Sequence, residues 1–113
     1  MKISASIIVK NEESVMQRCL ECVSLWADEI IVVDTGSTDR TKEIASAYPK
    51  VKLFDSEHFG KETQYKDFQF NIAKNEAITK CTGDWIIWWD ADDYIDADGA
   101  ALIRKLANDT QED

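Results

Sequence analysis

The protein has 113 residues, the size of a single domain, and its 44% hydrophobic and 31% charged residues are typical of a globular rather than a disordered chain. With 13 basic and 22 acidic residues, the net charge of −9 disfavours nucleic acid and anionic membranes as partners. The longest apolar run covers residues 85–89, far short of the roughly 20 residues of a membrane span, so no membrane span is expected.

The first part of the chain alternates between strand and helix patterns. Residues 3–9 and 29–33 are β-branched runs that each lead into a polar turn, which is typical of buried strands. Between them, apolar residues recur at helical spacing and predict a helix over residues 14–24 that packs on those strands.

A second helix and a third strand follow. Ser37 or Thr38 can cap a helix that Pro49 stops after Tyr48. Residues 51–54 then predict a short strand, and the next segment, from Asp55 to Tyr65, is irregular.

The last part of the chain repeats the alternation. We expect a helix over residues 67–81 that ends at Thr82-Gly83, an apolar strand over residues 85–89 and a helix over residues 97–107. Alternating helices and apolar strands predict an α/β fold, with a Rossmann-like, mainly parallel sheet that carries helices on both faces. Residues 1–113 are expected to form one domain.

Carboxylates follow the apolar run directly. Asp90, Asp92 and Asp93 stand at its carboxyl end, where parallel sheets bind ligands, and two-residue alternation would place Asp90 and Asp92 on one side. Hard oxygen ligands with nothing soft nearby suit Mg²⁺ or Mn²⁺. The alternative is a solvated acidic turn that caps the last helix.

The ends of the first two strands also carry candidates. Asp34 precedes a glycine turn and can present a carboxylate to a ligand, whereas Ser37 and Thr38 are ordinary capping residues. The turn after the first strand has no glycine, which excludes a dinucleotide fingerprint and a P-loop. In this turn, Glu12 and Glu13 fit two interpretations equally well: charges at the start of a helix, or contacts to a ligand.

The cysteines and the single histidine are expected to have structural roles rather than redox or zinc-binding ones. Cys19 and Cys22 lie in the middle of a predicted helix, whereas a redox pair belongs at a helix start, so we expect them in the core. Cys81 and His58 are too distant in sequence to complete a zinc site, and His58 is expected at the surface. An odd cysteine count without a secretory signal favours reduced thiols in the cytoplasm.

Four motifs together resemble the family 2 glycosyltransferases. They occur in the family's order and nearly fill the chain, at residues 6–13, 28–39, 73–77 and 82–92. The resemblance implies a GT-A fold, in which a Rossmann-like nucleotide-binding half precedes an acceptor-binding half. It also implies that a sugar is transferred from a nucleotide-diphosphate donor with the help of Mn²⁺ or Mg²⁺. A UDP-sugar is the expected donor, and a donor with guanine as its base is the alternative.

The resemblance further implies a set of donor-binding residues. These are Val9, Asn11 and Glu12 along the nucleoside, Asp34 or Thr35 facing the base, and Lys74 toward the diphosphate, where the family often has arginine. Asp90 and Asp92 match the family's DXD motif, with Asp92 as the direct metal ligand and Asp90 on the ribose or a metal-bound water.

The chain is short for this family. Its members place the catalytic base well beyond the DXD motif, so we expect the base beyond residue 113 and a chain that is the donor-binding half of a longer enzyme. Two alternatives stay open: a haloacid-dehalogenase-like phosphatase that uses Asp90 and Asp92, and a non-catalytic nucleotide-binding or assembly module.

Overall fold

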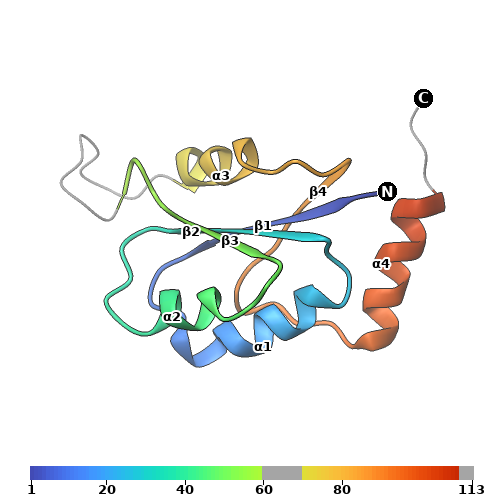
Figure 1. The fold of residues 1–113 in the computed structure, drawn as a ribbon, viewed down its shortest axis with the longest axis horizontal. Helices are drawn as coiled ribbons and strands as arrows, with labels where there is room; N and C mark the ends of the chain where they lie inside the picture. The colour runs from blue at the N-terminus through green and yellow to red at the C-terminus, as the bar shows by residue number, and fades with distance from the viewer. Residues whose placement is uncertain (60–69, 110–113) are drawn as a thin grey trace.

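The computed structural model describes residues 1–59 and 70–109 and contains one four-stranded sheet (Figure 1). Its strands are β1 (Ile3–Val9), β2 (Glu29–Asp34), β3 (Val51–Asp55) and β4 (Trp85–Trp88). They lie in the order β3-β2-β1-β4, and every neighbouring pair is parallel. The order places the two earliest strands in the centre, where every residue of β1 and β2 except Ile8 is buried, including Ser4 and Ser6.

Helices cover both faces of the sheet, as expected (Figure 1). They are α1 (Glu13–Ser24), α2 (Thr41–Ser46), α3 (Phe70–Thr79) and α4 (Ala97–Asp109). One core joins α1, α2 and α4 to one face, and a smaller core joins Ala77 of α3 to Ile31 and Val33 on the other. The expected α/β, Rossmann-like architecture is therefore confirmed.

The predicted core face of α1 is confirmed. Met16, Cys19, Leu20 and Val23 are buried, because four apolar positions at helical spacing form one stripe against the sheet. Burial raises the pKa of Cys19 to about 12, which leaves an unreactive thiol. Cys22 is buried as well, so both cysteines belong to the core, and all three cysteines are free.

The second helix begins later than expected. It starts at Thr41 and ends at Ser46, and Asp39 accepts hydrogen bonds from the backbone and hydroxyl of Thr41. The expectation that Ser37 or Thr38 caps this helix is wrong, because the turn that contains them bonds to the segment after β1 instead.

The region around α3 also differs from the expectation. Residues 60–69 lie outside the described residues, and α3 ends at Thr79 rather than at residue 81. Gly83 does not end the helix: a Cβ there would lie 2.7 Å from the backbone nitrogen of Ser4, so the residue allows a close approach to β1.

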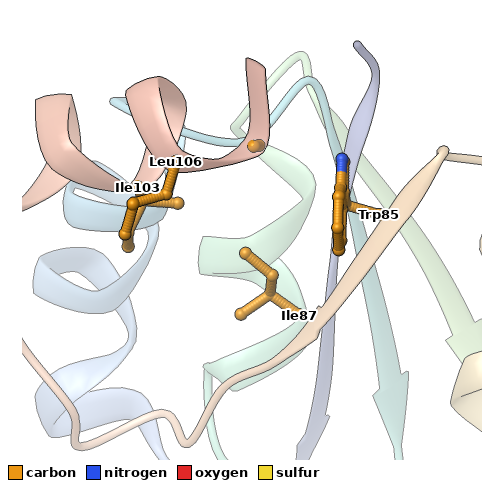
Figure 2. Close-up of a pocket in the computed structure, with 5 residues that line it drawn as sticks. Trp85, Ile87, Ile103 and Leu106 are labelled. Atoms are coloured by element: carbon orange, nitrogen blue, oxygen red, sulfur yellow. The ribbon is translucent and has the colours of Figure 1, made fainter. Parts of the chain in front are cut away.

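β4 is less buried than its apolar sequence predicts. Among the described residues it pairs with β1 alone, and Ile86 is 42% exposed. On the other face, Trp85 and Ile87 form an apolar hollow with Ile103 and Leu106 of α4 (Figure 2). An edge strand keeps one side unpaired, which explains why the run of apolar residues did not produce full burial.

No helix among the described residues is long and apolar enough to cross a membrane.

Candidate functional site

The carboxyl ends of β1, β2 and β4 meet at one edge of the sheet, because parallel strands all end on the same side. Val9 pairs with Asp34, and the next residue, Thr35, bonds to the Val9 carbonyl through both its backbone nitrogen (2.9 Å) and its hydroxyl (3.0 Å). The turn after β2 is therefore tied directly to the end of β1.

A pocket of about 230 Å³ opens at this edge. Four residues proposed for donor binding line it, namely Val9, Glu12, Thr35 and Asp90. The pocket wall also contains Ile8, Lys10 and Phe70, which the sequence did not single out. Ile8 and Lys10 flank a motif residue and could have been found from it, whereas Phe70 comes from α3 and joins the pocket only through the fold.

The acidic residues after β4 do come together. Ligand atoms of Asp90, Asp92 and Asp93 lie within 4.8 Å of one another. The reason differs from the strand alternation expected, because the chain leaves the sheet after Trp88 and turns, with the Asp93 backbone nitrogen donating to the Asp90 carbonyl at 3.0 Å. A turn, rather than an extended strand, converges the carboxylates.

Burial and neighbouring negative charges raise the pKa values of carboxyl groups in and beside this acidic cluster. Burial, followed by the charges of Asp93 and Asp92, raises the pKa of Asp90. Burial also raises the pKa of Glu12, with further contributions from Asp92, Asp39 and Asp90. None of the ion pairs among residues 1–59 and 70–109 involves the three clustered carboxylates. An all-oxygen set of this charge suits a hard divalent cation.

Asp34 has one occupied and one open carboxylate oxygen. Oδ1 accepts hydrogen bonds from the backbone nitrogens of Gly36 (2.9 Å) and Ser37 (2.8 Å). The residue is only 3% exposed, and within the described part of the chain its Oδ2 has no hydrogen-bond partner. A buried acceptor left without a donor is costly. Asp34 lines a second pocket at this edge of the sheet, together with Gly36, Ser37 and Lys42, rather than the pocket that contains Val9 and Asp90.

Asn11 joins the turns after β1 and β2. Its φ of 53° lies in the left-handed region, which asparagine tolerates better than most residues. Its backbone nitrogen donates to Ser37 Oγ at 2.9 Å, and its side-chain oxygen accepts from the Thr38 backbone nitrogen at 2.7 Å. The side-chain oxygen of Asn11 therefore shapes the site by holding the two turns together.

Lys74 lies near the acidic end of β4 without lining the pocket. Its ammonium group is 5.4 Å from the centre of the Trp88 ring, and Phe70 packs edge-on against the same ring at 5.2 Å. None of the ion pairs within the described ranges includes Lys74, so its charge is held by an aromatic face and is available to an anion.

Comparison with known proteins identifies a family. Residues 4–113 match the sequence profile described as "Glycosyl transferase family 2". A TPR repeat-containing protein of Synechococcus elongatus is 41% identical over 104 residues, which cover 92% of this chain and 24% of that protein. The chain thus spans about a quarter of the length of the curated relatives it matches.

Two solved structures have the same fold over this chain. S. aureus TarS 1–349 in complex with UDP has a TM-score of 0.69 and 25% identity, covering 95% of this chain and 33% of its own. Glucosyl-3-phosphoglycerate synthase from Mycobacterium tuberculosis, in complex with Mn²⁺, UDP and glucosyl-3-phosphoglycerate, has a TM-score of 0.64 and 26% identity, covering 80% and 33%.

Proposed function

The chain belongs to glycosyl transferase family 2, and on that premise we propose that residues 1–113 form the donor-binding part of an enzyme that transfers a sugar from a UDP-sugar to an acceptor. The two structural neighbours are UDP complexes, which supports this donor class. The chain matches about a third of each neighbour, so we assign acceptor binding and the general base to the part of such an enzyme that this chain does not match.

The unpartnered oxygen of Asp34 is the observation that carries the proposal. Uracil presents an N–H group between two carbonyls, and a carboxylate oxygen without a donor complements that N–H. Asp34 and Thr35 are consecutive and line two neighbouring pockets, so a donor whose base lies at Asp34 would reach the pocket of Val9 and Glu12 past Thr35.

The acidic cluster fits a divalent cation. Asp92 would hold Mn²⁺ or Mg²⁺ directly, and Asp90 would contact the ribose or a water on the metal. When bound, such a cation neutralises the negative charge that develops on the departing nucleoside diphosphate. Lys74, held over Trp88 from α3, adds a positive charge near the end of β4, as a point charge rather than a bidentate arginine.

The two alternatives are less well supported. A haloacid-dehalogenase-like phosphatase would use Asp90 and Asp92 as nucleophile and acid, but the family match over residues 4–113 argues against that fold family. A non-catalytic module would keep the sheet without metal-dependent donor binding, so a binding measurement separates it from our proposal.

Calorimetric titration of the chain with UDP tests the proposal. We expect binding in the presence of Mn²⁺. We expect Asp92→Ala to lower the affinity at least about tenfold, because Asp92 would hold the cation that offsets the charge of the diphosphate. Asp98→Asn is the matched control, since Asp98 is an exposed carboxylate in the first turn of α4 outside the cluster. Equal affinities for Asp92→Ala and the parent would reject the metal site.

A further inference from the structure

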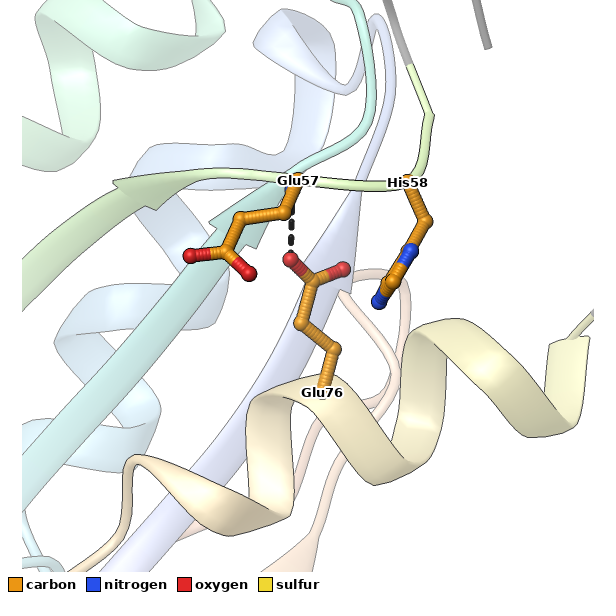
Figure 3. Close-up of side chains that lie close together, drawn as sticks. All are labelled: Glu57, His58 and Glu76. Carbon is orange, nitrogen blue, oxygen red and sulfur yellow. Dashed lines mark hydrogen bonds between the residues drawn. The ribbon is translucent and has the colours of Figure 1, made fainter. Parts of the chain in front are cut away.

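A second group of metal-ligating side chains lies on the α3 side of the sheet. Glu57 and His58 follow β3, Glu76 comes from α3, and ligand atoms of the three residues lie within 4.8 Å of one another (Figure 3). His58 was expected at the surface, but it is half-buried and faces the Glu76 carboxylate. Tertiary packing has therefore converted an isolated histidine into part of a cluster.

The cluster is held in place by hydrogen bonds. Glu76 is 8% exposed, and its carboxylate accepts from Ser56 Oγ at 2.7 Å and from the Glu57 backbone nitrogen. Ser56 Oγ in turn accepts from the backbone nitrogens of His58 (3.1 Å) and Phe59 (3.0 Å). The loop that presents Glu57 and His58 is thus fastened to the third ligand, and such outer bonds orient metal ligands.

Neither Glu57 nor Glu76 forms an ion pair with another described residue, so a cation bound between them would offset the repulsion of the two carboxylates. Lys80 lines the same open pocket, but its ammonium lies 4.8 Å from the centre of the Phe54 ring. A like-charged pair, one member of it buried, is stabilised by a cation bound between its oxygens.

We propose that Glu57, His58 and Glu76 form a binding site for a divalent transition-metal ion of the Zn²⁺ class. Zn²⁺ commonly takes three protein ligands of imidazole and carboxylate type and keeps a fourth position for water, which the open pocket permits. The imidazole nitrogen distinguishes this site from the all-oxygen cluster at Asp90 and Asp92, which suits Mg²⁺ or Mn²⁺.

Metal binding here would link the segment after β3 to α3. Glu57 and His58 are separated from Glu76 by more than a dozen residues along the chain, so a shared ion would join two elements through the folded state alone. An ion that binds only the native protein stabilises it by mass action. The proposed role is therefore structural and separate from donor binding.

The test uses tag-free protein with excess Mg²⁺ to saturate the all-oxygen cluster, and titrates Zn²⁺ against a chromophoric chelator. We expect stoichiometric Zn²⁺ binding that weakens at least tenfold in His58→Ala and in Glu57→Gln. Asp92→Ala should retain it, as should the surface control Glu21→Gln. Because His58 is the single histidine, its imidazole NMR signal reports ligation directly.

Several outcomes would overturn the proposal. Unchanged Zn²⁺ affinity in both variants would remove the site, and a near-ultraviolet thiolate band with Co²⁺ would assign binding to a cysteine. A His58 signal that does not change when metal is added would show that His58 is not a metal ligand. Because Glu76 is buried and fastens the loop to α3, the exposed Glu57 carries the carboxylate test. UDP binding is measured on the same variants, which separates failure here from failure of the proposed function.

Discussion

Asp34 illustrates how one side chain can build and serve a site. One carboxylate oxygen organises the turn after β2, and the other is buried without a partner in the described residues. Burying a carboxylate oxygen in this way costs stability unless a ligand satisfies it.

Asp34→Asn replaces one carboxylate oxygen by an amide NH₂ group, a hydrogen-bond donor, while keeping the side-chain shape. We expect UDP affinity to fall about 10- to 100-fold, since a hydrogen bond to a charged group contributes roughly 1.5–3 kcal/mol. Calorimetry with UDP and Mn²⁺ measures the change, and binding of Mn²⁺ alone should stay as in the parent.

Asp55→Asn is the control for the loss of charge. Asp55 ends the neighbouring strand, lines the same small pocket as Asp34 and is exposed, where its carboxylate pairs with Lys42 at 2.6 Å. A similar drop in UDP affinity for both variants would show that charge, not the open oxygen of Asp34, governs binding.

At the scale of elements, Glu29 joins β2 to β1, to β3 and to the segment before β4. It lies at the start of β2, and its carboxylate accepts from Ser4 of β1 (2.7 Å), Lys52 of β3 (2.9 Å) and Thr82 just before β4 (2.8 Å to the hydroxyl). Burial alone would raise the pKa of Glu29, but the bonds from Lys52, Thr82 and Ser4 outweigh it and hold that pKa well below the usual range.

Glu29→Gln should reduce the free energy of unfolding by about 3 kcal/mol at neutral pH, because it removes one partner of a buried charged network. The folded pKa lies below the unfolded value of about 4.3, so the contribution is complete above that pH and is lost as pH falls below it. Urea unfolding at several pH values should show the gap between variant and parent closing under acid conditions.

Glu21→Gln provides the comparison for this stability measurement. Glu21 is an exposed residue of α1, and within residues 1–59 and 70–109 its carboxylate accepts only a surface hydrogen bond from Gln17 at 3.2 Å. Its replacement should change stability by no more than about 0.5 kcal/mol. A cost for Glu29→Gln as small as this would refute the role of Glu29 as the link between strands.

At the scale of the whole molecule, charge and topology act together. The chain carries a net charge of −9, and six of its carboxylates lie between Asp84 and Asp98 with no lysine or arginine among them. An anionic nucleotide that approaches the end of β4 is repelled unless a cation is present. Donor binding by this molecule should therefore depend on a divalent ion more strongly than its few direct contacts would require.

Thermal unfolding checks this expectation. UDP with Mn²⁺, at 100 times the dissociation constant, should stabilise the protein by about 2.7 kcal/mol and raise its Tm by roughly 10 °C. UDP without a divalent ion should give a much smaller shift, and uridine, which lacks the diphosphate, should show no dependence on Mn²⁺. Equal shifts for UDP with and without Mn²⁺ would contradict the expectation.

Local patterns in the sequence determined much of this molecule. The β-branched runs at residues 3–9 and 29–33 and the apolar stripe of α1 specified two central strands and a covering helix, because periodicity and burial follow from residues close in the chain. The same local logic placed carboxylates at the end of an apolar strand, and the motif order indicated the family.

Only the tertiary structure decided which of these segments meet. The strand order brings the end of β2 beside β1 and leaves Asp34 Oδ2 buried. It lets the Ser37 hydroxyl accept a hydrogen bond from the Asn11 backbone nitrogen instead of capping a helix. It also places Glu76 against His58, which no spacing predicts. Contacts between distant segments depend on packing energy summed over the whole core, so the chain's local preferences could specify the elements but not these encounters.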